Sequence, residues 1–148
     1  PTVYQETVFY AGNEGTLYAI DAETGQLEWD FTATDYVSSP TVIDDIVYVG
    51  TGGGGVVYAL DATTGGIEWE STAFSGNPGS PTVQDGVLFV GTGAGNLHSL
   101  DLDPGESVWE FTNPERSLFP PTAYENSVYV GSKDNTVYAG DTGNGEQQ

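Results

Sequence analysis

The chain contains no cysteine, one histidine and only two basic residues, Arg116 and Lys133. Without cysteine there can be no disulfide, no thiolate metal site and no cysteine nucleophile. A single histidine excludes a metal site built from several histidines and argues against a Ser-His-Asp catalytic triad. The scarcity of Lys and Arg argues against electrostatic binding to nucleic acid or to an anionic membrane. The apolar runs are also far shorter than the ~20 residues that span a bilayer, so no membrane insertion is expected.

Acidic residues are abundant: there are 22 Asp and Glu, and the formal net charge is −20. Aromatic residues make up 12% of the chain, which argues against a disordered acidic tail. A folded domain with this charge repels itself in dilute buffer, whereas molar salt shortens the Debye length to about 3 Å. We therefore predict a halophilic protein. The alternatives are an acidic secreted domain from a mesophile or a calcium-binding surface.

The sequence is periodic. A Pro-Thr pair, a short apolar run and a second run ending in aspartate recur four times, and successive aspartates lie 40 residues apart. A glycine follows each aspartate by four residues, and a tryptophan follows the first three aspartates by eight. The corresponding fourth position is 149, beyond the sequence. Because a repeat of about 40 residues is typical of stacked or radial architectures, the period decides the expected fold.

Each repeat is interpreted as four short strands joined by turns rich in Gly, Asp and Asn. The second strand is apolar on consecutive residues, which indicates burial on both faces. The fourth strand alternates, so we expect Leu27, Trp29 and Phe31 to pack together and Glu28 and Asp30 to face solvent. The prediction is an all-β fold, a β-propeller segment of about three and a half four-stranded blades. The expected blades span residues 1–39, 40–80, 81–120 and, without a fourth strand, 121–148.

The segments 21–29 and 61–69 both read Asp-Ala-x-Thr-Gly-x-x-Glu-Trp, which resembles the tryptophan-docking motif of the pyrroloquinoline-quinone-type propeller repeat. The third copy keeps the aspartate, glycine and tryptophan but has Leu-Asp-Pro after the aspartate. The resemblance implies that each tryptophan packs between neighbouring blades, so these residues are expected to be structural. They are Asp21, Thr24, Gly25, Trp29, Asp61, Thr64, Gly65, Trp69, Asp101, Gly105, Trp109 and Asp141.

Members of the resembled superfamily divide into quinoprotein dehydrogenases and propellers without a quinone, such as the outer-membrane assembly lipoprotein and archaeal surface proteins. The dehydrogenases typically carry a vicinal cysteine pair and a tryptophan stacked on the cofactor. This chain has no cysteine, and the docking motif accounts for its three tryptophans. We therefore expect no catalytic, cofactor-binding or metal-binding residue, no quinone, and no calcium site with support in the sequence.

Other residues that might carry chemistry have simpler structural interpretations. His98 occupies a position that is tyrosine in the other repeats, so it is expected to pack in the core. The run 52–55, four glycines, precedes no helix and is interpreted as a hairpin rather than a phosphate-binding loop. The pairs Asp44–Asp45, Asp101/Asp103 and Asp134–Asn135 offer oxygen atoms for calcium, but none matches an EF-hand loop, and solvated turns are expected.

The connections between repeats hold the least regular residues, and loops on a rigid scaffold often carry recognition. A contact surface at one mouth of the ring is predicted from Tyr36, Phe74, Arg116 and Phe119. The predicted function is a non-catalytic propeller scaffold for protein–protein interaction, secreted or on the cell surface of a halophile. Its partner would be another protein, further blades of a ring of roughly seven or eight, or a second copy if this is the full chain. The alternatives are a quinoprotein oxidoreductase fragment and a ligand-binding sensor domain.

Overall fold

The structure is a computed structural model that describes residues 1–113 and 117–148. Within these residues the chain forms fifteen β-strands in four sheets and no helix. Blade 1 contains β1 (Thr2–Tyr4), β2 (Thr7–Ala11), β3 (Thr16–Asp21) and β4 (Leu27–Thr32). Blade 2 contains β5 (Thr41–Ile43), β6 (Ile46–Gly50), β7 (Val57–Asp61) and β8 (Ile67–Glu70). Blade 3 contains β9 (Thr82–Gln84), β10 (Val87–Gly91), β11 (Asn96–Asp101) and β12 (Ser107–Thr112). Blade 4 contains β13 (Thr122–Tyr124), β14 (Ser127–Gly131) and β15 (Val137–Asp141).

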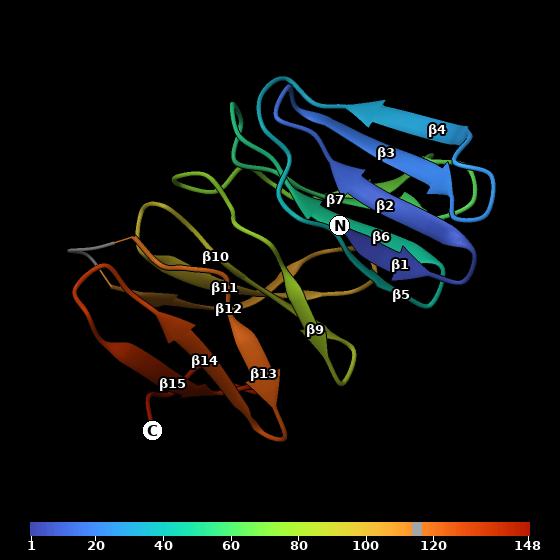
Figure 1. Cartoon of the computed structure of the whole chain (residues 1–148). Helices are drawn as coiled ribbons and strands as arrows, with labels where there is room; N and C mark the ends of the chain where they lie inside the picture. Colours follow the sequence, from blue (N-terminus) through green and yellow to red (C-terminus); the bar gives the residue numbers. More distant parts are fainter. Residues whose placement is uncertain (114–116) are drawn as a thin grey trace.

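Every sheet is an antiparallel meander whose strands follow chain order. The first strands of the blades are neighbours, because β1 contacts β5, β5 contacts β9 and β9 contacts β13. Figure 1 shows these strands near the middle of the molecule and β4 at its rim, with the sheets following one another along an arc. The predicted all-β fold, a propeller segment of about three and a half blades, is confirmed.

The core lies between the sheets. Each blade has a forward face, which meets the next blade along the chain, and a rear face, which meets the preceding one. Because cross-strand partners share a face, Phe9, Ala19 and Trp29 lie together on the forward face of blade 1. They pack in one cluster with Val47 and Leu60, which share the rear face of blade 2. Two similar clusters join blade 2 to blade 3 and blade 3 to blade 4.

The second strand behaves as predicted in the two inner blades. The side chains of Val47 and Val49 are fully buried and that of Tyr48 is 3% exposed. In blade 3, the corresponding run 88–90 is also fully buried. Each of these strands is therefore covered on both faces by a neighbouring blade, which explains why its sequence does not alternate.

The predicted facing of the fourth strand was wrong at Leu27. Trp29 pairs with Ala19, but Leu27 pairs with Ile20, so a β-bulge leaves Glu28 as the extra residue. The bulge places Leu27 on the opposite face from Trp29, and 56% of its surface is exposed. The same irregularity occurs between Ala59 and Leu60 in blade 2 and recurs in blade 3. The two-residue alternation of the sequence therefore fails at this bulge.

Candidate functional site: blade junctions and free faces

The three tryptophans all make the same contact across a blade junction. The indole Nε1 of Trp29 donates a hydrogen bond to the carbonyl oxygen of Ala62 at 2.9 Å. Trp69 donates in the same way to Leu102 at 2.6 Å, and Trp109 donates to Thr142 at 2.9 Å. In each case the acceptor is the residue after the motif aspartate of the next blade. A buried indole N–H requires such a partner, so this bond fixes how far each blade is rotated against the next.

A glycine lies under each docked indole. A Cβ atom on Gly65 would lie 2.7 Å from a ring carbon of Trp29, and one on Gly105 would lie 2.5 Å from Trp69. Gly145 stands in the same relation to Trp109, at 2.6 Å. These glycines also have φ between 71° and 81°, in the left-handed region. Both the ring contact and the backbone conformation therefore require glycine.

The aspartate of the motif shapes the turn that carries this glycine. Asp21 Oδ1 accepts hydrogen bonds from the backbone N–H and the hydroxyl of Thr24, each at 2.6 Å. Asp61 accepts the same pair from Thr64, at 2.7 and 2.9 Å. The hydroxyl bond is the main reason that the pKa of each aspartate lies below its usual value. Both carboxylates therefore stay charged at neutral pH.

The turns of the last two repeats are simpler. Asp101 accepts one bond, from the backbone N–H of Asp103 at 3.2 Å, since proline stands where the earlier copies have threonine. Asp141 accepts from the backbone N–H of Gly143 at 2.9 Å. The fourth turn keeps the backbone bond of the earlier copies, because Gly145 N–H donates to the Asp141 carbonyl at 2.9 Å, as Gly25 N–H does to Asp21. The third turn keeps a different one: Asp101 N–H donates to the Glu106 carbonyl at 2.9 Å, as Asp21 N–H does to Gln26.

Blade 1 carries the same turn without an indole against it. Gly25 has a φ of 71°, the same as Gly65, but no atom lies within 4 Å of where its Cβ would stand. Ala22, the counterpart of Ala62, whose carbonyl oxygen accepts the indole hydrogen bond, is exposed, whereas Ala62 is 8% exposed. Blade 1 therefore holds a preformed tryptophan seat, formed by residues 21–25, that is open in this chain.

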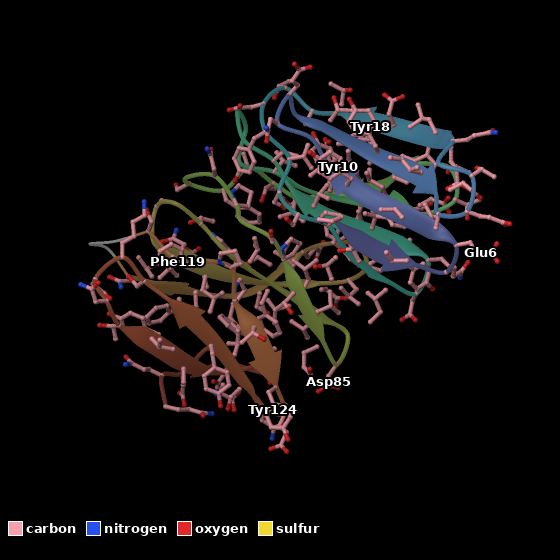
Figure 2. All side chains as sticks on the ribbon, viewed as in Figure 1. Glu6, Tyr10, Tyr18, Asp85, Phe119 and Tyr124 are labelled. Atoms are coloured by element: carbon pink, nitrogen blue, oxygen red, sulfur yellow. The ribbon has the colours of Figure 1, made fainter. Side chains whose placement is uncertain are left out.

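The rear face of blade 1 and the forward face of blade 4 are both uncovered. Tyr10 is 44% exposed, whereas Val49, Val90 and Val130, its counterparts in the other blades, are at most 2% exposed. Tyr129 is 37% exposed. Its counterparts are Phe9, Tyr48 and Phe89, which are at most 3% exposed. Figure 2 shows Tyr10 and Tyr18 on blade 1 and Tyr124 at the tip of the β13–β14 hairpin.

The predicted mouth surface is only partly accessible. Tyr36 is half-buried, and its hydroxyl donates to the carbonyl oxygen of Pro78 in the next connection. Phe74 packs against His98, whereas Phe119 is 49% exposed and follows Leu118 in the connection to blade 4. Among the described residues, no ring contact or hydrogen bond joins Tyr36, Phe74 and Phe119 to one another. Arg116, the fourth predicted member, lies outside the described residues.

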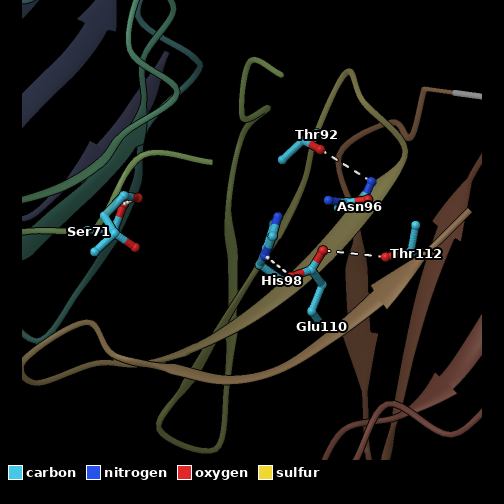
Figure 3. A network of polar contacts seen from close by, with 7 residues as sticks. Ser71, Thr92, Asn96, His98, Glu110 and Thr112 are labelled. Atoms are coloured by element: carbon cyan, nitrogen blue, oxygen red, sulfur yellow. Dashed lines mark hydrogen bonds and ion pairs between the residues drawn. The ribbon is translucent and has the colours of Figure 1, made fainter. Parts of the chain in front are cut away.

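His98 lies in the core at the junction of blades 2 and 3, and it is 5% exposed. Its ring centroid is 4.2 Å from that of Phe74, and its Nδ1 is 3.7 Å from Glu110 Oε2 (Figure 3). Burial lowers the pKa of His98, and the Glu110 carboxylate opposes this shift. The junctions on either side carry the pairs Phe31–Tyr58 and Phe111–Tyr138 in the same role. Phe74 therefore supplies the aromatic contact at this junction, where Ser71 stands at the position that Phe31 and Phe111 hold in blades 1 and 3.

The remaining acidic candidates lie in turns. Asp44 and Asp45, with φ of 49° and 62°, form the two-residue turn between β5 and β6. Asp134 accepts hydrogen bonds from the Tyr138 hydroxyl at 2.7 Å and from Asn113 Nδ2 at 2.9 Å, and the first of these is the main cause of its lowered pKa. Glycines 52–55 turn the chain between β6 and β7, with Thr51 N–H bonded to the Val56 carbonyl. Across residues 1–113 and 117–148, no group of three or more His, Cys, Asp or Glu side chains is placed to hold a metal ion.

Several solved structures share the fold. A computationally designed protein, Ika4, matches with a TM-score of 0.88 and 21% identity, over 95% of this chain and 88% of its own. BamB from Moraxella catarrhalis matches with a TM-score of 0.77 and 24% identity, over 98% of this chain and 45% of its own. Quinohemoprotein alcohol dehydrogenase ADHIIG from Pseudomonas putida HK5 matches with a TM-score of 0.84 and 20% identity, over the whole of this chain and 33% of its own. The chain thus spans less than half the length of the last two proteins.

No helix within the described residues is long and apolar enough to cross a membrane. Among curated proteins, none matches the sequence. The family model described as outer membrane protein assembly factor BamB does match, over residues 1–73 and 53–148. Together these two ranges cover the whole sequence, and they agree with the repeated junction described above. The chain therefore belongs to the BamB family of PQQ-type β-propeller repeat proteins.

Proposed function

We propose that this chain is a non-catalytic β-propeller scaffold for protein–protein interaction, and that its free blade faces are the contact surfaces. The proposal is carried by the contrast between Tyr10, 44% exposed, and its buried counterparts in the other blades. Apolar faces that the fold buries at every internal junction are left open at both ends of the arc. Contiguous exposed apolar surface of this kind is typical of association sites.

We further propose that the protein works in a halophile, secreted or at the cell surface. The charge of −20 supports the halophilic part of this proposal, and so does its distribution, because no described Asp or Glu side chain is buried. The carboxylates therefore cover the surface without disturbing the core. A surface of this kind stays soluble in concentrated salt, where repulsion between the carboxylates is screened.

The rival proposal is a fragment of a quinoprotein oxidoreductase, and the likeness to the dehydrogenase is the observation that favours it. The residues of this chain do not fit a quinone site. Each of its three indoles donates its N–H to a neighbouring blade and packs against a glycine there, so all three are part of blade junctions. The chain also has no cysteine for a vicinal pair. We therefore propose that it holds no quinone and carries out no redox step.

Titration with pyrroloquinoline quinone and calcium, followed by tryptophan fluorescence, tests the catalytic half of this proposal. The titration is made in about 2 M KCl, which screens the repulsion between the carboxylates. A parallel titration with a calcium chelator is the control. We expect no saturable change in fluorescence and no dye-linked alcohol oxidation. Stoichiometric, calcium-dependent quinone binding would overturn the scaffold proposal.

The interaction half is tested by retaining proteins from the source cells on the immobilised chain. The matched control is a double variant, Tyr10→Glu with Tyr129→Glu, which places a charge on each free face. We expect proteins that the wild-type chain retains and the double variant does not, identified by mass spectrometry, and a second copy of this chain counts among them. Identical retained sets would show that the free faces are not contact surfaces.

A further inference from the structure

We propose that two copies of this chain associate head to tail, with the forward face of blade 4 in one copy packed on the rear face of blade 1 in the other. Both such junctions form in the pair, so the eight blades close into a ring, within the usual size range for propellers. This inference rests on the proposed scaffold function and names the partner of its free faces.

The first support is that this chain already contains the required interface three times. At each internal junction a forward face packs on a rear face, and the open ends offer one face of each kind. The rear face of blade 1 carries Val8, Tyr10 and Ile20, where blade 2 has Val47, Val49 and Leu60 on the face that meets blade 1. A second copy therefore continues an interface that the fold already uses.

The forward face of blade 4 is also built for this contact. Its exposed side chains include Tyr129 at 37%, Tyr124 at 67% and Val137 at 71%. Tyr129 and Ala139 are cross-strand partners, in the places that Phe9 and Ala19 hold in blade 1. Blade 4 therefore carries the aromatic side chain that packs against the next blade at each internal junction, but here no blade packs against it.

Hydrogen bonds between inner strands at the first two internal junctions point to the same register. Thr2 Oγ1 donates to the carbonyl oxygen of Pro40 at 2.7 Å, and Thr41 Oγ1 donates to that of Pro81 at 2.6 Å. Thr122, the counterpart in blade 4, is exposed and its hydroxyl has no partner among the described residues. Packing blade 4 on blade 1 of another copy places this hydroxyl opposite the carbonyl of Pro1.

The open tryptophan seat of blade 1 faces the same partner. Gln147 bridges to Gly140, and Gln148 N–H donates to the Ala139 carbonyl at 3.0 Å, so these residues begin a fourth strand on blade 4. The next position is 40 residues beyond Trp109, in register with the docked tryptophans. A tryptophan there would point at the seat beside Gly25 of the other copy.

Charge does not oppose the pairing more than it opposes the internal junctions. Asp30 of the blade 1 rear face and Asp141 of the blade 4 forward face have acidic counterparts at internal junctions, Glu70 and Asp61. The overall charge of −20 per copy still repels at long range, so the pairing requires screening. Association should therefore be weak in dilute buffer and strong in molar salt.

The test is molar mass in solution, by light scattering on eluted protein in about 2 M KCl. The expected mass is twice the 15.6 kDa of one chain, independent of concentration once the ring has closed. Tyr10→Glu and Tyr129→Glu should each shift the mass to that of one chain. Ile67→Glu is the matched control, since Ile67 is 54% exposed on an inner blade, and it should leave the pair intact.

Mixing the two face variants distinguishes head-to-tail contact from other arrangements. A mixture of Tyr10→Glu and Tyr129→Glu chains retains one intact junction, so two-chain species should reappear where each variant alone gives none. A tryptophan appended after Gln148 should lower the dissociation constant of the pair at least about tenfold, because the tryptophan seat of blade 1 in the other copy is open. Gly25→Ala should cancel that gain.

Three results would overturn the inference. A single-chain mass at all concentrations, or masses that grow without limit as in an open filament, would exclude the closed pair. Loss of pairing from only one of the two face variants would exclude head-to-tail contact. Each of these results leaves the scaffold proposal standing if quinone binding is absent, whereas quinone binding would overturn that proposal whatever the mass.

Discussion

Gly65 lies so close to the indole of Trp29 that a Cβ atom on the glycine would stand 2.7 Å from ring atom Cε3. Gly25 adopts the same φ of 71° in the same turn, but no atom lies within 4 Å of its Cβ position. The two glycines therefore differ in one respect, which is the presence of an indole. Substituting the two glycines in turn therefore separates the cost of a clash with the indole from the cost of a side chain at positive φ.

Gly65→Ala should destabilise the protein more than Gly25→Ala does. Both substitutions place an alanine at positive φ, which costs about 1–2 kcal/mol. Only Gly65→Ala also collides with a ring, which adds about 1–3 kcal/mol of overpacking. Chemical denaturation in molar salt measures the difference, and equal costs would mean that the indole does not pack on Gly65.

Trp29→Ala should lower the free energy of unfolding by about 3–5 kcal/mol, as for other buried large side chains. Trp29→Phe keeps much of the apolar contact but loses the hydrogen bond to Ala62, so its cost should be smaller. Asp30→Asn, at an exposed position of β4, is the control and should stay within about 0.5 kcal/mol. A comparable loss in the control would contradict the observed facing of β4.

The melting temperature should rise with salt. At a net charge of −20, repulsion between carboxylates favours expansion in dilute buffer, and salt in the molar range screens it. Circular dichroism or tryptophan fluorescence followed from about 0.1 to 2 M KCl measures the effect. A constant melting temperature over this range would contradict the halophile proposal.

The stability should also fall in weak acid because of His98. Burial lowers the pKa of His98 in the folded protein below its value of 6.5 in the unfolded chain. The stability that depends on a neutral imidazole is therefore fully present above about pH 6.5 and is lost as the pH falls through the lowered folded value.

His98→Tyr tests this, because tyrosine stands at the same position in the other three repeats. The variant should match the wild-type protein near pH 7.5 and exceed it in melting temperature near pH 5, where the wild-type imidazole takes up a proton on unfolding. Glu110→Gln is a second check, since removing this carboxylate should lower the pKa of His98 further. An unchanged pH dependence in His98→Tyr would assign the acid response to other groups.

Much of the fold follows from the sequence because the repeat is local. The 40-residue spacing of the motif aspartates and the short apolar runs define four strands per unit, and a blade is built from neighbouring hairpins. The local pattern did not reveal the β-bulge between Leu27 and Trp29, because an extra residue in one strand is visible only against its partner strand. For the same reason, Leu27 was expected in the core and lies exposed.

The sequence by itself determined the repeat, the charge and the residues that form each docking turn, because these depend on residue types at fixed local spacing. The tertiary structure alone decided which seats hold an indole. Gly25, Gly65, Gly105 and Gly145 occupy the same place in the repeat, yet Gly25 has no ring against it. The difference arises because an indole reaches the glycine 36 residues later in the next blade, so a seat is filled only where a preceding blade stands beside it. The tertiary structure likewise decides which blade faces are exposed, because the exposure of a side chain depends on the neighbouring blade and not on the residue type.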